Sequence, residues 1–102
     1  MTVEKNELRL SARYTIEAVF VITGRGLVFV GEAREGNIHT GDYMEFMAFG
    51  ENRLRQINGI SFGGKPGVNV IGLLIRCRDE KEIEELRRLT SFPVEALIYK
   101  QQ

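Results

Sequence analysis

The segment that decides the fold runs from Val19 to Asp42 and reads VFVITGRGLVFVGEAREGNIHTGD. Within it, glycine recurs every five residues, at Gly26, Gly31, Gly36 and Gly41, between short apolar stretches. Glycine is favoured where the backbone needs a positive φ angle, or where a neighbouring strand comes too close for a Cβ atom. The spacing therefore predicts tight corners in a small, strongly bent sheet.

Segments rich in β-branched and aromatic residues flank these glycines, as expected of strands. In the third of them, Met44, Phe46 and Ala48 alternate with more polar residues, which predicts one apolar face and one mixed face. Alternation breaks in the fourth near Asn58 and Gly59, which predicts a β-bulge there. The fifth is so apolar that we expect burial on both of its faces. The six predicted strands cover residues 14–22, 27–30, 43–49, 53–62, 68–75 and 94–99.

One helix is predicted, over residues 79–90. Asp79 is suited to cap its N-terminus, and Glu82 stands where a capping box places an acidic residue. An apolar stripe for packing on the sheet consists of Ile83, Leu86 and Leu89, and a solvated outer face consists of Glu80, Glu84, Arg87 and Arg88. Six strands with glycine corners and one short helix predict an all-β, six-stranded closed Greek-key barrel.

Composition predicts a single domain over residues 1–102, with residues 1–12 partly flexible. Fourteen basic residues balance fourteen acidic ones, so binding to nucleic acid would require a local basic patch. Cys77 is the only cysteine, which fits a reducing compartment. The N-terminus lacks the apolar core of a signal peptide, and no apolar run approaches the roughly 20 residues that span a bilayer. We expect a cytoplasmic protein without membrane contact.

Several sequence motifs, taken in their order along the chain, resemble those of a known domain. The motif FVITGRGLVFVG over residues 20–31, the glycines at 36 and 41, and VIGLLIRC over residues 70–77 are together similar to the second domain of translational GTPases such as elongation factor Tu. The resemblance implies the six-stranded translation-protein barrel, here as a stand-alone protein. It also implies a docking role, because the family uses this domain beside its GTPase domain and on the ribosome.

The chain departs from that family in three places. No phosphate loop precedes Val19, and the GTPase domain is absent. The loop at residues 63–67 is shorter than the one that approaches transfer RNA in elongation factor Tu, so no such residue is transferred. The helix from Asp79 is longer and more charged. The sequence GISFGGK at 59–65 matches only part of a phosphate-loop pattern, because Pro66 replaces the required Ser or Thr and a strand follows. We expect no enzyme activity, catalytic residue, cofactor or metal site.

The candidate partner-contacting residues are basic: Arg25, Arg53, Arg55 and Lys65. Such a patch could touch phosphates, whereas the alternative for Arg25 is a structural role across the mouth of the barrel. Cys77 stands between two arginines that could activate it, but a small apolar filler is the favoured interpretation. His39 is interpreted as a solvent-facing turn residue.

The sequence leaves three functional hypotheses. The first is a non-catalytic binding module that docks on a protein or ribonucleoprotein partner; net charge does not favour direct RNA contact. The second is a structural protein that self-associates as a homo-oligomer without a nucleic-acid role. The third is a small-ligand binder that uses the mouth of the barrel.

Overall fold

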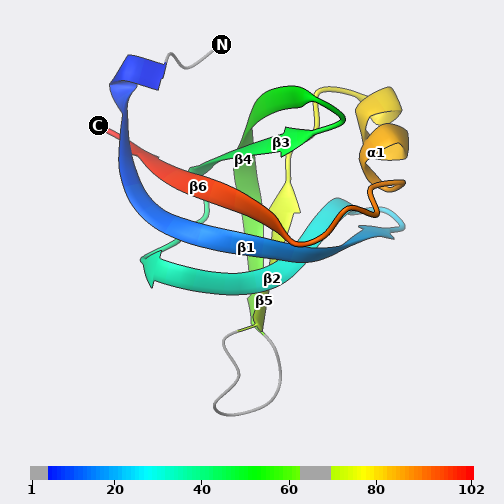
Figure 1. The fold of residues 1–102 in the computed structure, drawn as a ribbon, viewed down its shortest axis with the longest axis horizontal. Helices are drawn as coiled ribbons and strands as arrows, with labels where there is room; N and C mark the ends of the chain where they lie inside the picture. The colour runs from blue at the N-terminus through cyan, green and yellow to red at the C-terminus, as the bar shows by residue number, and fades with distance from the viewer. Residues whose placement is uncertain (1–4, 63–69) are drawn as a thin grey trace.

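A computed structural model describes residues 5–62 and 70–102 (Figure 1). Strands account for most of these residues. A short 3-10 helix, η1, and a single α-helix, α1, complete the described part. The elements are η1 (Lys5–Glu7), β1 (Leu8–Ile22), β2 (Gly26–Gly36), β3 (Tyr43–Ala48), β4 (Glu51–Phe62), β5 (Val70–Ile75), α1 (Glu80–Leu86) and β6 (Val94–Gln101).

The six strands close into a ring in the order β1-β2-β5-β4-β3-β6, with every neighbouring pair antiparallel. Closure into a barrel leaves few free strand edges, which protects a small sheet from pairing with other chains. Helix α1 lies at one end of the ring (Figure 1). The prediction of an antiparallel all-β chain of six strands with one short helix is confirmed. No helix in the described ranges is long and apolar enough to cross a membrane.

The inner face of the ring forms one hydrophobic core that includes residues from every strand and from the helical segment. Phe29 and Phe46 pack edge to face at its centre, with ring centroids 5.1 Å apart. The core consists of Ala12, Tyr14, Ile16, Leu27, Phe29, Met44, Phe46, Ala48, Ile57, Leu73, Ile75, Leu86, Leu89, Ala96 and Ile98.

Strand β1 begins at Leu8, six residues before the predicted start. Its first half pairs with β6, from Leu8 opposite Gln101 to Ile16 opposite Val94. The local pattern around residues 8–12 did not reveal this pairing, because the partner lies at the far end of the chain. Residues 8–12 belong to this strand, residues 1–4 lie outside the described part, and the partial flexibility expected of residues 1–12 stays a prediction.

Gly31 corrects the prediction that each of the four glycines marks a corner. It lies inside β2, which runs on to Gly36 instead of ending at residue 30. A Cβ atom at Gly31 would lie 1.8 Å from the carbonyl oxygen of Thr15 on β1. This glycine is therefore required by the close approach of two strands, whereas Gly26 and Gly41 have positive φ angles of 120° and 98°.

Strands β3 to β5 follow the predicted pattern with one exception. Met44, Phe46 and Ala48 are buried, and the pairing of β4 with β5 shifts register between Ile57 and Gly59, where the bulge was predicted. Burial of the fifth strand on both faces is wrong: its outward side chains are only half-buried, because no second layer among the described residues covers them.

Helix α1 is shorter than the predicted range 79–90. The carboxylate of Asp79 accepts a hydrogen bond from the Glu82 N–H at 2.9 Å, which confirms the cap. The helix ends at Leu86, and the next turn tightens as the Leu89 N–H donates to the Leu86 carbonyl. Leu86 and Leu89 are buried and Ile83 packs against the core, so the predicted apolar stripe is confirmed.

Candidate functional site

Two of the predicted basic residues, Arg53 and Arg55, project from one face of β4 toward helix α1. They meet at the carboxylate of Glu82. Arg53 Nη1 donates to Glu82 Oε2 at 3.1 Å, and Arg55 Nε donates to Glu82 Oε1 at 2.8 Å. Arg53 also donates to Glu85 at 2.7 Å, and the Arg78 N–H donates to Glu82 at 2.7 Å. We call Arg53, Arg55 and Glu82 the arginine–glutamate cluster.

The cluster lies largely out of contact with solvent. The side chain of Glu82 is 0% exposed, that of Arg53 is 2% exposed and that of Arg55 is 18% exposed. Burial by itself would raise the pKa of Glu82, but hydrogen bonds from Arg55 and from the Arg78 N–H outweigh it and hold the pKa at about 2. The charges of Arg53 and Arg55 are therefore used to attach α1 to the ring.

Of the three predicted basic residues that the structure describes, Arg53 and Arg55 meet, and Arg25 does not join them. Arg53 and Arg55 are engaged by Glu82, whereas Arg25 is exposed in the turn between β1 and β2. Within the described ranges, the side chain of Arg25 has no hydrogen bond or ion pair. Lys65 lies outside the described residues. Contact of any of the four with a partner stays a prediction.

An apolar groove of about 610 Å³ lies on the outer surface of the ring and extends to Arg25. Residues that face one another across neighbouring strands form a row along the groove: Phe20 is opposite Val28, Val28 is opposite Leu74, and Leu74 is opposite Gly59. Directly opposed residues point to the same face of a sheet, so this row projects outward while the alternating positions fill the core. The groove is lined by Phe20, Val21, Ile22, Arg25, Val28, Val30, Gly59, Ile60, Ser61, Val70, Gly72 and Leu74.

Glycines hollow the floor of this groove. A Cβ atom at Gly72 would lie 3.2 Å from Val28 Cγ1 and 3.7 Å from the Cβ of Ser61, within the space that the groove now occupies. At the rim, Phe20 is 56% exposed and Ile22 is 44% exposed. Large apolar side chains around a depression characterise surfaces that bind another apolar group.

The sequence reasoning missed the groove, although a signal was present. Residues 18–22, 27–30 and 70–75 are apolar at nearly every position, so their outward positions are apolar as well as their inward ones. That pattern predicts a covered sheet. The structure shows no second layer over this face among the described residues, so the apolar positions line an open groove.

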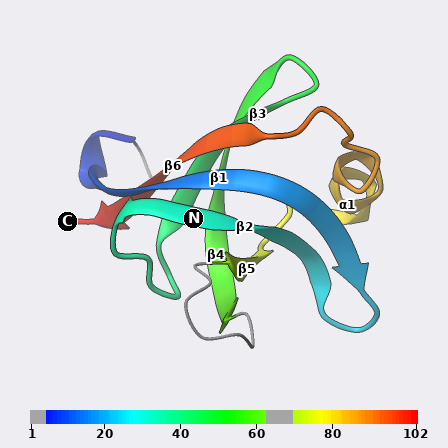
Figure 2. The same cartoon turned by 60° about the horizontal axis from the view of Figure 1, so that its bottom comes forward.

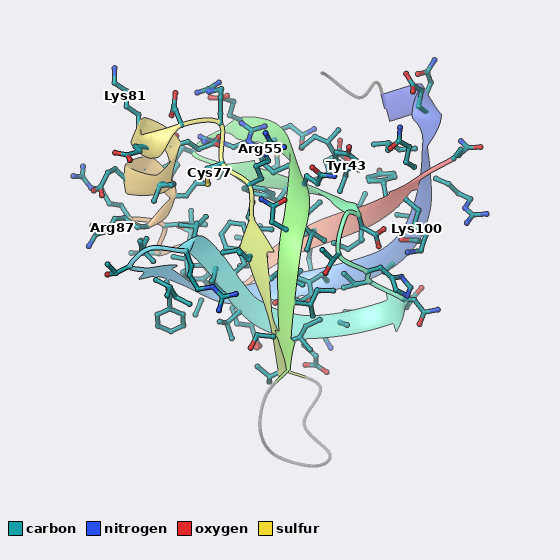
Figure 3. The ribbon with its side chains drawn as sticks, turned by 180° about the vertical axis from the view of Figure 1, so that it is seen from behind. Tyr43, Arg55, Cys77, Lys81, Arg87 and Lys100 are labelled. Carbon is teal, nitrogen blue, oxygen red and sulfur yellow. The ribbon has the colours of Figure 1, made fainter. Side chains whose placement is uncertain are left out.

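Cys77 and His39 lie away from the groove. Figure 3 shows Cys77 next to Arg55, at the end of the ring where α1 lies. Burial and the charge of Glu82 raise the pKa of the Cys77 thiol to about 11, which agrees with its interpretation as a packing residue. His39 is exposed near a turn, as predicted, and its Nδ1 lies 2.6 Å from Lys100 Nζ.

The phosphate-loop pattern at 59–65 is split between a strand and undescribed residues. Gly59 to Phe62 belong to β4, and the strand β5 follows the undescribed residues 63–69. No protein-family model matches this chain. The groove is the feature from which we argue a function, since it offers an apolar surface with one cation, Arg25, among the described residues that line it.

Proposed function

We propose that this protein is a non-catalytic binding module of the translation-factor barrel type, which docks on a protein partner through the apolar groove. The motif at residues 20–31 and the six-stranded antiparallel ring support the resemblance to the second domain of elongation factor Tu. The fold alone does not specify a role, so the groove carries the proposal.

The single observation behind this proposal is exposed apolar surface around a hollow. If a partner removes Phe20 and its neighbours from water, the binding free energy becomes more favourable by about 25 cal/mol per Å² of apolar area buried, without any new polar contact. A bulky apolar side chain of a partner matches such a surface. A ribonucleoprotein partner is less favoured, because the arginine–glutamate cluster already uses the charges of Arg53 and Arg55.

Site-specific photo-crosslinking in the cell of origin tests the proposal. A photoreactive amino acid at Ser61, in the groove, should capture a defined protein, and the same group at Glu84, on the outer face of α1, should not. Adding Gly72→Val fills the floor of the groove and should abolish the Ser61 product. Equal products from both positions would contradict the proposal, and RNA as the captured species would favour the ribonucleoprotein alternative.

A further inference from the structure

The apolar groove has a cation at one of its ends. Arg25 is among the residues that line the groove, and it is exposed in the turn between β1 and β2. The Arg25 N–H donates to the Ile22 carbonyl at 2.9 Å and closes this turn, which fixes the backbone that carries the guanidinium. Figure 1 and Figure 2 both show the turn on the side of the ring where α1 lies.

A second cation, Arg76, lies beyond the same end. It directly follows β5, and its N–H donates to the Gln56 carbonyl of β4 at 2.9 Å, so strand pairing continues one residue past Ile75. Side chains alternate between the two faces of a strand, which places Arg76 on the outward face with Leu74. Arg76 is exposed, and within the described ranges neither its side chain nor that of Arg25 has a hydrogen bond or an ion pair.

A glycine lies between these two sides of the groove. Gly26 on β2 is opposite Ile22, and it stands next to Leu27, the partner of Ile75. A Cβ atom at Gly26 would lie 3.9 Å from Leu74 Cδ1, so the space beside this glycine borders the groove. No side chain of β2 therefore fills the outward face between the β1–β2 turn and the end of β5.

The opposite end of the groove carries an anion. Glu32 is opposite Val70, which lines the groove, and directly opposed residues share a face of the sheet. The side chain of Glu32 is half-buried there. The sign of the charge thus reverses along the groove, which opposes a chain of phosphates and matches an occupant with a single carboxylate at the Arg25 end.

We propose that the partner segment in the groove is an acidic, apolar peptide. One bulky apolar side chain fills the hollow over Gly72, and an adjacent Asp or Glu pairs with Arg25 and Arg76. The inference rests on the proposed function and adds the chemistry of the partner. The apolar lining supplies most of the affinity, whereas the two cations at the rim select the sequence and its direction in the groove.

Selection from a random peptide library displayed on phage tests this chemistry on the full chain. The wild type should enrich sequences in which Asp or Glu adjoins a large apolar residue. The double variant R25E/R76E should enrich Lys or Arg at that position instead. The matched control R9E/R13E reverses two exposed cations in the half of β1 that pairs with β6, and it should select the same acidic sequences as the wild type.

Fluorescence anisotropy of one selected peptide then measures the affinity. Arg25→Glu and Arg76→Glu should each weaken binding by about fivefold, as expected for an exposed ion pair turned into a repulsion. Gly72→Val should weaken it by about tenfold or more, since it fills the floor of the groove. Ser61→Trp should do the same from β4, and because Ser61 is exposed this variant leaves the core intact.

Three outcomes would overturn the inference: no enriched sequence that depends on an open groove, groove-dependent sequences without an acidic preference, or an acidic preference that R25E/R76E leaves unchanged. Groove-dependent peptides without an acidic preference would leave the proposed function standing. Conversely, acidic groove-dependent peptides together with no protein captured at Ser61 in the cell would support this charge preference and contradict the proposed function. The two failures are therefore distinguishable.

Discussion

Arg53 on β4 and Glu82 on α1 form an ion pair inside the protein, with Nη1 3.1 Å from Oε2 and both side chains at most 2% exposed. The residues are separated by 29 positions in the chain. Arg55 binds the same carboxylate, so one buried anion holds two cations. This contact attaches the helix to the ring.

Replacing Glu82 with glutamine should destabilise the fold by about 3 kcal/mol or more, because it removes the buried carboxylate that Arg53 and Arg55 share and leaves the buried Arg53 with solvent-exposed carboxylates only. Urea denaturation followed by circular dichroism at pH 7 measures the change. The control is Glu84→Gln, which removes an exposed pair with Arg87 at 3.2 Å and should cost less than about 1 kcal/mol. Equal losses in the two variants would show that the cluster does not hold the helix.

Acid should weaken the protein through the same carboxylate. The folded-state pKa of Glu82, about 2, lies below its ordinary value of 4.5, so the stabilisation is fully present above pH 4.5 and declines as the pH falls toward 2. The free energy of unfolding, measured in urea at several pH values, should therefore fall more steeply below pH 4.5 in the wild type than in Glu82→Gln. Parallel curves for the two proteins would argue against this assignment.

A single methyl group at Gly31 should be poorly tolerated. The added Cβ of Gly31→Ala would lie 1.8 Å from the Thr15 carbonyl oxygen, so β1 and β2 must separate, at a cost of about 3 kcal/mol. Gly59→Ala is the control, since its Cβ would make ordinary contacts with Leu74 at 3.5 Å. Thermal unfolding should show a melting temperature many degrees lower for Gly31→Ala than for Gly59→Ala.

Cys77 should react slowly with alkylating reagents at neutral pH. Raising its pKa from 9.0 to about 11 lowers the thiolate fraction at pH 8 by about 100-fold. The rate of iodoacetamide modification of the folded protein should keep increasing up to about pH 11, and unfolding in urea should restore the rate of an ordinary thiol. A plateau near pH 8.5 in the folded protein would refute the expectation.

The groove and the arginine–glutamate cluster show why the sequence predicted the candidate site only in part. Arg53 and Arg55 stand two positions apart in the predicted fourth strand, which places them on one face, and the structure has both at Glu82. Glu82, the anion that both arginines bind, was assigned to helix capping because it stands three residues after Asp79. Its carboxylate accepts instead from the N–H of Arg78 and from the side chains of Arg53 and Arg55. Spacing along the chain identifies a local partner, whereas a buried charge binds whatever cation the fold brings to it.

The sequence by itself determined the strand-rich character of the chain, the buried face of Met44 and Phe46, the bulge at Gly59 and the Asp79 cap, because each follows from backbone preferences and alternation within a few residues. Tertiary structure decided the rest. Only the pairing of β1 with β6, near the far end of the chain, places its start at Leu8, and only the end of that pairing at Ile16 leaves residues 18–22 paired, among the described strands, with β2 alone. Contacts of that kind depend on which distant segments the closed ring brings together, and no local pattern encodes them.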